Sequence, residues 1–191
     1  MSSTSTPNSC SSSGQPQVER LFFALWPTDD VRQTIKRHCK SLLRHTGGRP
    51  VAEENLHITL AFLGSVDAVQ HACVEEVATA IQLPSFELIL DQIGYWARPR
   101  VLWLGAREIP EPLQLLVNTL NKGCGDCGLS LDKRPFKAHL TLKRKVHQAP
   151  PTEEVKPVLW PVERFVLVKS NTLPQGVQYE VVREWLLQAN S

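Results

Sequence analysis

The feature that most constrains this 191-residue chain is a tripeptide that occurs twice, as His57-Ile58-Thr59 and as His139-Leu140-Thr141, 82 positions apart. Each copy begins a short apolar run, and such runs predict β-strands. Side chains alternate along a strand, so the histidine and threonine of each copy lie on one face and the apolar residues on the other. Each copy therefore presents an imidazole beside a hydroxyl on a surface that is backed by a hydrophobic core.

The sequence before each tripeptide follows the same plan, which indicates an internal duplication. A buried strand comes first, then an amphipathic helix ended by glycines, and then the strand that carries the tripeptide. The distance from Leu21 to His57 is 36 residues, and the distance from Leu102 to His139 is 37. In the first unit we predict a strand at 21–26 and a helix at 31–43, which Gly47-Gly48 ends. In the second unit we predict a strand at 101–104 and a helix at 113–120, which Gly123, Gly125 and Gly128 end.

Two such units, related by a pseudo-two-fold axis, would turn both tripeptides toward a common cleft. We therefore predict an α+β fold with two pseudo-symmetric lobes, each a small mixed or antiparallel sheet with outer helices, that face a central groove. No boundary rich in Pro or Gly interrupts the chain, so residues 19–191 are expected to form a single domain. The remaining predicted elements are a helix at 69–81 and strands at 86–93, 162–169 and 179–187.

Residues 1–18 contain no charged side chain and are rich in Ser, Thr, Pro and Gly. They lack the apolar core of a secretory signal and the arginines of a mitochondrial presequence, so we expect a disordered tail. No segment of the chain approaches the length of a transmembrane helix. These features predict a cytoplasmic protein without a membrane partner.

The formal net charge of +2 excludes a protein that binds nucleic acid through a uniformly basic surface. The cations are instead concentrated, because residues 133–147 contain six Lys or Arg residues and no acidic residue, with His139 in their middle. Such a run is often only a solvated face. Because this one encloses one of the two histidines, it also predicts a local site for an anion.

Five cysteines, an odd number in a chain without an export signal, predict free thiols in a reducing compartment. Cys124 and Cys127 form a single CxxC pair, for which a structural turn, a metal site and a redox pair are the alternatives. A zinc site needs a second pair of ligands, whereas Cys39 and Cys73 are isolated in the sequence. A redox pair would stand at the start of a helix, whereas this pair follows a helical pattern. We therefore interpret it as part of a turn.

The residues around both tripeptides resemble the two-histidine phosphoesterase superfamily and, within it, the RNA 2′,3′-cyclic phosphodiesterases. One His-x-Thr is a weak signal, but a pair at matching places in a repeated unit is fairly strong. Where the family usually has proline, this chain has Ala138, which should loosen the start of the strand without changing the chemistry. The resemblance covers nearly all of residues 20–187, and its motifs are Arg20-Leu21-Phe22-Phe23-Ala24-Leu25-Trp26-Pro27, Glu54-Asn55-Leu56-His57-Ile58-Thr59-Leu60-Ala61-Phe62-Leu63-Gly64 and Arg134-Pro135-Phe136-Lys137-Ala138-His139-Leu140-Thr141-Leu142-Lys143-Arg144.

The resemblance implies a hydrolase that opens RNA 2′,3′-cyclic phosphate ends to 2′-phosphomonoesters and needs neither a metal nor a cofactor. In enzymes similar to this one the first histidine is the general acid for the 3′ oxygen and the second activates water, which makes His57 the proton donor and His139 the proton acceptor. The residues suit this chemistry, because an in-line displacement needs a base and an acid on opposite sides of phosphorus. Thr59 and Thr141 can hydrogen-bond the non-bridging oxygens as charge develops on them.

Arg144 lies five positions after the second histidine and matches a phosphate-binding position of the family. Strict alternation places its side chain on the face opposite His139, so this role requires twist or a β-bulge at the strand end. Several aromatic residues are candidates for stacking on a base, although a place in the core is the alternative for each. These are Phe22, Phe62, Tyr95, Trp96, Trp103 and Phe136.

Other functions stay open at this stage. The substrate could be a cyclic ADP-ribose phosphate or a 2′–5′ linkage, and a non-catalytic RNA or nucleotide-binding module could keep the same fold. A thiol or zinc protein built on Cys124 and Cys127 is a third class, but it leaves the histidine repeat unexplained. The two intact histidines and threonines argue against a module that only binds. The expected partners are RNA ends or small cyclic nucleotides, bound by a monomer.

Overall fold

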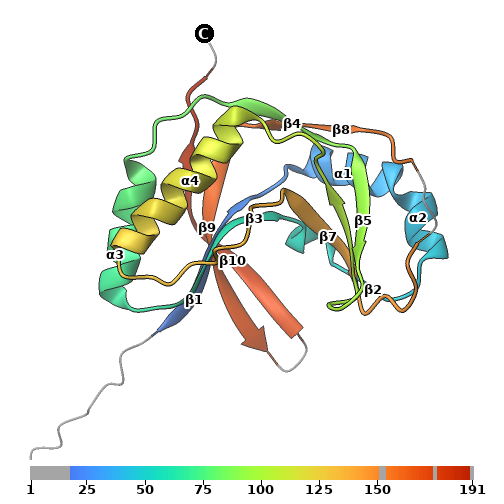
Figure 1. Ribbon diagram of the computed structural model, residues 1–191, viewed down its shortest axis with the longest axis horizontal. Coiled ribbons are helices and arrows are strands. Elements are labelled where there is room, and N and C mark those ends of the chain that lie inside the picture. Colours follow the sequence, from blue (N-terminus) through green and yellow to red (C-terminus); the bar gives the residue numbers. More distant parts are fainter. Residues whose placement is uncertain (1–17, 151–153, 174–175, 190–191) are drawn as a thin grey trace, which may run out of the picture.

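The computed structural model describes residues 18–150, 154–173 and 176–189. Figure 1 shows a mixed α+β molecule, with α3 and α4 at one side of the strands and α1 and α2 at the other. The strands are β1 (Glu19–Leu25), β2 (Arg49–Pro50), β3 (Ile58–Val66), β4 (Phe86–Leu90), β5 (Gln92–Trp96), β6 (Val101–Gly105), β7 (His139–Arg144), β8 (Val158–Val162), β9 (Arg164–Leu173) and β10 (Gly176–Leu186). The helices are α1 (Asp29–His38), α2 (Lys40–His45), α3 (Ala68–Thr79) and α4 (Glu111–Asp126), with a short 3-10 helix η1 (Glu53–Asn55).

The large sheet consists of two antiparallel halves that meet at one residue pair. Its order is β10-β9-β1-β3-β7-β6-β5, and the short strand β2 pairs with β7. β3 and β7 pair only through Ile58 and Leu140, the middle residues of the two tripeptides. β4 and β8 form a second sheet of two strands. The predicted two-lobed α+β fold is confirmed, and the two lobes share one sheet through this central pair.

Both predicted strand–helix–strand units are present. In the first, β1 leads into α1 and α2 and pairs with β3; in the second, β6 leads into α4 and pairs with β7. The sequence favours these helices locally. The first turn of α1 carries Asp29 and Asp30 and its last turn is basic, which suits the helix dipole. α4 begins directly after Pro110 and has a second proline in its first turn, where no intrahelical N–H bond is lost.

The prediction of a single strand at 86–93 is wrong. Asp91 separates β4, which belongs to the small sheet, from β5, at the edge of the large one. The backbone N–H of Asp91 donates to the carbonyl of Gly105, and its carboxylate accepts from the backbone N–H of Arg107 at 3.0 Å. Both halves of the segment are apolar, so the sequence pattern did not reveal the change of sheet.

The prediction that Gly123 and Gly125 end the second helix is also wrong, because α4 continues through both to Asp126. A Cβ atom at Gly123 would lie 2.4 Å from Val77 of α3. This glycine therefore allows the two helices to approach closely. The helix ends at Asp126, and Gly128, two residues later, has a φ of +81° that L-residues rarely adopt.

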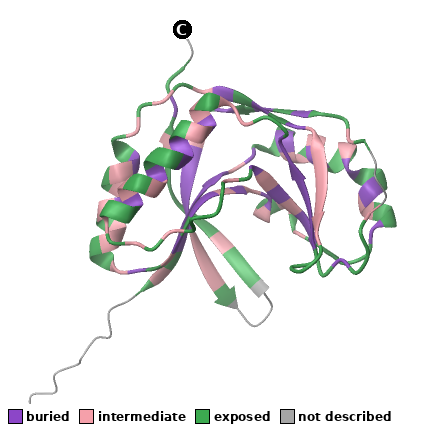
Figure 2. Cartoon of the chain, in the orientation of Figure 1, coloured by how far each residue is buried: buried purple, intermediate pink, exposed green. Residues whose placement is uncertain are grey.

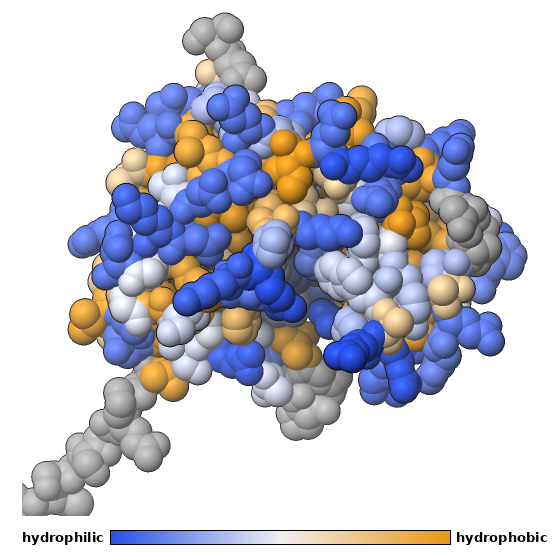
Figure 3. Space-filling model, viewed as in Figure 1, coloured by the Kyte–Doolittle hydropathy of each residue, from blue (hydrophilic) through white to orange (hydrophobic). Residues whose placement is uncertain are grey.

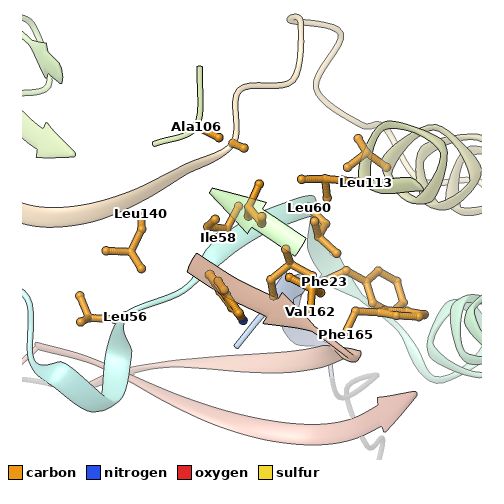
Figure 4. Packing of buried hydrophobic residues seen from close by; sticks show 14 of the residues in the cluster. Phe23, Leu56, Ile58, Leu60, Ala106, Leu113, Leu140, Val162 and Phe165 are labelled. Carbon is orange, nitrogen blue, oxygen red and sulfur yellow. The ribbon is translucent and has the colours of Figure 1, made fainter. Parts of the chain in front are cut away.

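The hydrophobic core joins both sheets and the helices. Figure 4 shows Phe23, Leu60, Val162 and Phe165 packed together, with Leu113 of α4 beside Leu60. β4 and β8 each alternate buried and exposed residues, so one face of the small sheet packs on this core. In Figure 2 the buried residues lie along the strands and on the helix faces turned toward them. This packing holds β3 and β7, so the histidines at their starts are carried by rigid elements.

The prediction that all cysteines are free thiols is wrong for two of them. Cys73 of α3 and Cys127, directly after α4, form a disulfide with a Cα–Cα distance of 5.9 Å. Their separation of 54 residues carries no sequence signal, and the packing of α3 against α4 brings them together. Cys39 and Cys124 are free and buried, and burial raises the pKa of each thiol to about 12. The CxxC pair is therefore not bonded to itself.

None of the helices in the described ranges is long and apolar enough to cross a membrane. The predicted disordered tail at 1–18 lies outside the described residues except for Val18, which is exposed immediately before β1. The cytoplasmic location stays a prediction.

Candidate active site

The two tripeptides bring their polar side chains to one face of the large sheet. His57 immediately precedes β3, and His139 begins β7. Because Ile58 pairs antiparallel with Leu140, the register sets His57 beside Thr141 and Thr59 beside His139. Ile58 and Leu140 point into the core and are fully buried. The two histidines and two threonines line one groove of about 800 Å³, at the junction of the two lobes.

Each imidazole is held in the same way. The Nδ1 of His57 lies 2.7 Å from the carbonyl oxygen of Asn55, and the Nδ1 of His139 lies 2.8 Å from that of Lys137. A carbonyl can only accept, so Nδ1 carries the proton in both rings. In the neutral form the Nε2 of each ring is then an unprotonated base available to the groove. The matched hydrogen bonds to the residue two positions earlier are the local counterpart of the internal duplication.

A β-bulge brings Arg144 into the groove. In the pairing of β6 with β7, Leu102 lies opposite Lys143 and Trp103 lies opposite Thr141, so Leu142 is an extra residue on β7. Leu142 and Lys143 are both buried, and the alternation resumes one residue later. Arg144 is therefore exposed on the face of His139 and lines the groove. This is the distortion that the sequence required for Arg144 to reach a bound phosphate.

The first lobe carries the same distortion. In the pairing of β1 with β3, Phe23 lies opposite Ala61 and Ala24 lies opposite Thr59, so Leu60 is the extra residue. Phe62, five positions after His57, is thereby exposed and lines the groove. The guanidinium of Arg20 lies 5.6 Å from the centre of its ring. The position that holds a cation in one lobe thus holds an aromatic ring in the other.

Aromatic rings surround His57. The ring of Trp26 is stacked parallel to the imidazole, with centroids 5.4 Å apart and planes 10° apart. Phe22 lies at 5.0 Å, and Tyr179 of β10 presents an edge contact at 5.1 Å. His139 has a more open surrounding, with the edge contact of Trp96 at 4.5 Å and Trp103 at 6.4 Å. The pseudo-symmetric histidines therefore have different environments.

Burial and nearby cations make both imidazoles easier to deprotonate. Burial lowers the pKa of His57 from 6.5 to about 4; the hydrogen bond to Asn55 opposes this shift, and the charges of Arg144 and His139 add to it. Burial also lowers the pKa of His139, opposed by its hydrogen bond to Lys137 and assisted by the charges of Lys137 and Arg144. Both rings are thus biased toward the neutral form before an anion binds.

The basic segment 133–147 divides into groove residues and structural residues. Lys143 is buried, and its Nζ donates to the carbonyl oxygens of Leu43 and Thr46 at 2.7 and 2.5 Å, which satisfies the end of α2. Lys137 lies over the ring of Trp103 at 4.1 Å. The cations that line the groove are Arg20, Arg49, Arg134, Arg144 and Lys145, and no acidic residue among those the structure describes lines it. In Figure 3 strongly hydrophilic residues lie on both sides of the middle of the viewed face.

Of the aromatic residues that were candidates for stacking on a base, some line the groove and others belong to the core. Phe22, Phe62 and Trp96 line the groove. Trp103 is buried, and Tyr95 donates from its hydroxyl to the carbonyl oxygen of Val146. Phe136 packs against the core.

Two aromatic residues beside His57 were missed from the sequence, and so were the groove cations Arg20 and Arg49. Trp26 and Tyr179 contact His57 from outside the repeated tripeptides. Trp26 ends the first predicted strand, and its place directly after Leu25, which pairs with Ile58 in the structure, brings it beside His57. Tyr179 lies 122 positions after His57, and no local pattern connects them.

The arrangement is suited to acid–base chemistry at a phosphorus atom. Two imidazoles share one groove, and one can take a proton while the other delivers a proton to a leaving oxygen. The threonine hydroxyls and the Arg144 guanidinium can bind the other oxygens of an anionic phosphate. In the described ranges, no group of three or more His, Cys, Asp or Glu side chains is arranged to hold a metal ion.

Comparison with known proteins places the fold and sequence in a family. The sequence model described as the 2′-5′ RNA ligase superfamily matches residues 26–173. An RNA 2′,3′-cyclic phosphodiesterase of Escherichia coli (strain K12) is 36% identical over 175 residues, which cover 90% of this chain and 98% of that protein. One from Archaeoglobus fulgidus is 34% identical over 174 residues, covering 86% and 98%. The crystal structure of E. coli LigT complexed with 3′-AMP has a TM-score of 0.83 at 35% identity, and the match covers 90% of this chain and 99% of that one.

Proposed function

Because the chain belongs to the 2′-5′ RNA ligase superfamily, we propose that it is a hydrolase that opens 2′,3′-cyclic phosphate ends of RNA and leaves 2′-phosphomonoesters. The relatives that cover most of the chain carry the name RNA 2′,3′-cyclic phosphodiesterase. The observation that carries the proposal is the matched pair of imidazoles, each fixed through Nδ1 and each with Nε2 available to one groove.

In this mechanism His139 is the general base and His57 the general acid. His139 takes a proton from a water molecule as the water oxygen attacks phosphorus. The bond between phosphorus and the 3′ oxygen breaks, and protonated His57 delivers its proton to that oxygen. The products are a free 3′-hydroxyl and a 2′-phosphate, and the proton gained by His139 is returned to His57 through solvent. Each proton transfer contributes roughly 10²–10⁴ to the rate.

Thr59, Thr141 and Arg144 are the proposed phosphate ligands. Antiparallel register sets each threonine beside the histidine of the other tripeptide, so each hydroxyl is near one end of the reaction axis. The bulge at Leu142 turns the guanidinium of Arg144 into the same groove. A guanidinium can bind two oxygens of one phosphate, and its charge stabilises the negative charge that grows in the transition state.

The bound anion also explains how His57 can be protonated when it acts as the acid. In the free protein the pKa of His57 is lowered to about 4, so the acid is mostly neutral at pH 7. An anionic phosphate between the rings favours their charged forms and raises both pKa values. The substrate therefore promotes the protonated state of His57 that its own cleavage requires.

The finer features of the prediction are proposals as well. We infer that the substrate is an RNA end or a small cyclic nucleotide, that the protein acts as a monomer in the cytoplasm, and that it uses no metal.

The test is hydrolysis of a short RNA with a 2′,3′-cyclic phosphate end in the presence of EDTA, after exhaustive dialysis. The expected product carries its phosphate on the 2′ oxygen, which ³¹P NMR and comparison with authentic 2′- and 3′-phosphates identify. Loss of turnover on chelation, with recovery on adding Zn²⁺ or Mn²⁺, would show that the histidines are metal ligands instead. A 3′-phosphate product would reverse the assignment of the leaving oxygen.

A further inference from the structure

Two arginines face each other across the short pairing of β2 with β7. Arg49 lies directly opposite Arg144 in the antiparallel register. Residues paired in this way point to the same face of the sheet, and both side chains are exposed and line the groove. Lys145, the next residue, lines it as well. Like charges placed directly opposite destabilise a sheet, so this group of three cations is unfavourable unless an anion binds there.

The charges of this group have no counterion in the described part of the chain. Neither Arg49, Arg144 nor Lys145 takes part in any ion pair found there. Arg134, by contrast, lines the same groove but is paired with Asp132. Since none of the described residues that line the groove is acidic, these cations are available for an anionic ligand.

The backbone beneath these side chains is tightly held. A Cβ atom at Gly48 would lie 2.7 Å from the carbonyl oxygen of Arg144, so β2 sits directly against the end of β7. The backbone N–H of Val51 donates to the carbonyl of Leu142 at 2.9 Å, and that of Val146 donates to Arg100 at 3.0 Å. The cations therefore extend from a fixed frame rather than from a loose loop.

The cyclic phosphate that reacts does not need the positive charges of all three residues. A 2′,3′-cyclic phosphate carries one negative charge, and the proposed mechanism already assigns it to Arg144 and the two histidine–threonine pairs. We propose that Arg49 and Lys145 form a second anion site, which binds another phosphate of the same substrate beside the reacting one. The inference rests on the proposed function, because both sites share one groove. The substrate class is a cyclic-phosphate nucleotide that carries a further phosphate, either internucleotide or at its 5′ end.

The kinetic test compares three substrates: adenosine 2′,3′-cyclic phosphate, its 5′-phosphorylated form, and the dinucleotide ApA ending in the cyclic phosphate. Arg49→Gln and Lys145→Gln are each expected to lower the ratio of kcat/KM for a two-phosphate substrate over the one-phosphate substrate by roughly 3- to 10-fold, the range of a partly exposed charge-assisted contact. The matched controls Arg44→Gln and Lys40→Gln remove exposed cations of α2 that do not line the groove, and should leave the ratio unchanged. If the substitutions lower the ratio for the dinucleotide, the second site binds the internucleotide phosphate. If they lower the ratio for the 5′-phosphorylated nucleotide, the site binds the 5′-terminal phosphate.

Salt provides a second readout that a purely structural role would not change. For the wild type, the slope of log kcat/KM against log salt should be steeper by about 0.7 for the responding substrate than for the one-phosphate substrate. Arg49→Gln should reduce this difference. An equal loss on all three substrates would overturn the proposal, because it would show that Arg49 serves the reacting phosphate.

Binding separates this inference from the hydrolysis itself. Calorimetric titration of adenosine 2′-phosphate and adenosine 2′,5′-bisphosphate needs no turnover. A preference for the bisphosphate that Arg49→Gln and Lys145→Gln diminish would support the second site even if no cyclic phosphate were hydrolysed. The second site is refuted if the wild type neither binds the bisphosphate more tightly than adenosine 2′-phosphate nor has a higher kcat/KM for the dinucleotide than for adenosine 2′,3′-cyclic phosphate. The hydrolysis itself can still hold in that case.

Discussion

At the scale of single residues, the site is built from two imidazoles with the same hydrogen bond and different surroundings. Both Nδ1 atoms are held by the carbonyl two positions earlier. The face of His57 has the parallel ring of Trp26 against it, whereas Trp96 and Trp103 make edge contacts with His139. The duplication thus supplies two equivalent groups, and the rings around them make the groups unequal, as distinct acid and base roles require.

The first prediction at this scale concerns the histidines. His57→Ala and His139→Ala should each lower kcat by roughly 10²-fold or more, because one imidazole cannot act on both sides of an in-line displacement. Circular dichroism and thermal unfolding check that the fold persists. His45→Ala is the matched control, since His45 is exposed on α2 and does not line the groove. If either groove variant kept more than half of the wild-type turnover, the two-histidine mechanism would be wrong.

The second prediction is the pH dependence. The rise and fall of kcat/KM with pH give the pKa values of the acid and the base in the free protein. In the free protein the pKa of His57 is lowered to about 4, and that of His139 is also lowered. The bell of kcat/KM should therefore be centred below pH 6.5. A bound phosphate favours the imidazolium forms and raises both pKa values, so the bell of kcat should lie at higher pH. Rates from pH 4 to 9, with a solvent isotope effect to verify that proton transfer is rate-limiting, test this order. A kcat profile at the same or lower pH would contradict it.

At the scale of the elements, two β-bulges decide which residues face the groove. Without the extra residues Leu60 and Leu142, strict alternation would turn Phe62 and Arg144 away from the histidines. β2 then supports the end of β7 just beyond the second bulge. The position of Arg144 therefore depends on how closely β2 can approach.

Gly48 tests this dependence. Gly48→Ala places a Cβ 2.7 Å from the carbonyl oxygen of Arg144 and imposes a φ of +94° on an L-residue. It should lower the free energy of unfolding by about 1–3 kcal/mol and reduce kcat/KM, because β2 and the end of β7 must separate. Gly47→Ala is the control, since a Cβ there meets nothing within 4 Å. Urea unfolding and steady-state kinetics measure both effects, and equal behaviour of the two variants would refute the close packing.

At the scale of the whole molecule, the groove lies where the two lobes meet, while the disulfide links α3 and α4 away from it. Neither Cys73 nor Cys127 lines the groove. Stability and catalysis should therefore respond differently to loss of this bond.

Cys127→Ser should lower the free energy of unfolding by about 2–4 kcal/mol, because the bond closes a loop of 54 residues in the unfolded chain. Its kcat should stay within twofold of the wild type. Reductant should lower the unfolding midpoint of the wild type but leave that of Cys127→Ser unchanged. A wild-type midpoint insensitive to complete reduction, verified by thiol titration, would show that the bond does not contribute.

The sequence determined the two repeated units and the identity of the central residues, but not β2 or β8, and it predicted one helix where the structure has α1 and α2. Hydrophobic periodicity is a local property, so it revealed both strand–helix–strand units and the two His-x-Thr tripeptides on the strand faces. It failed at residues 86–93, where one apolar run serves two sheets, and at Gly123, where helix packing overrides the tendency of glycine to end a helix.

The contacts between residues that are distant in the sequence follow from tertiary packing. The bulge that turns Arg144 into the groove arises from pairing with β6, and the approach of Arg49 to Arg144 arises from pairing with β2. The aromatic contacts of Trp26 and Tyr179 with His57 and the bond between Cys73 and Cys127 join segments far apart in the chain. Such contacts depend on how packed elements share space, and local sequence patterns carry no record of that.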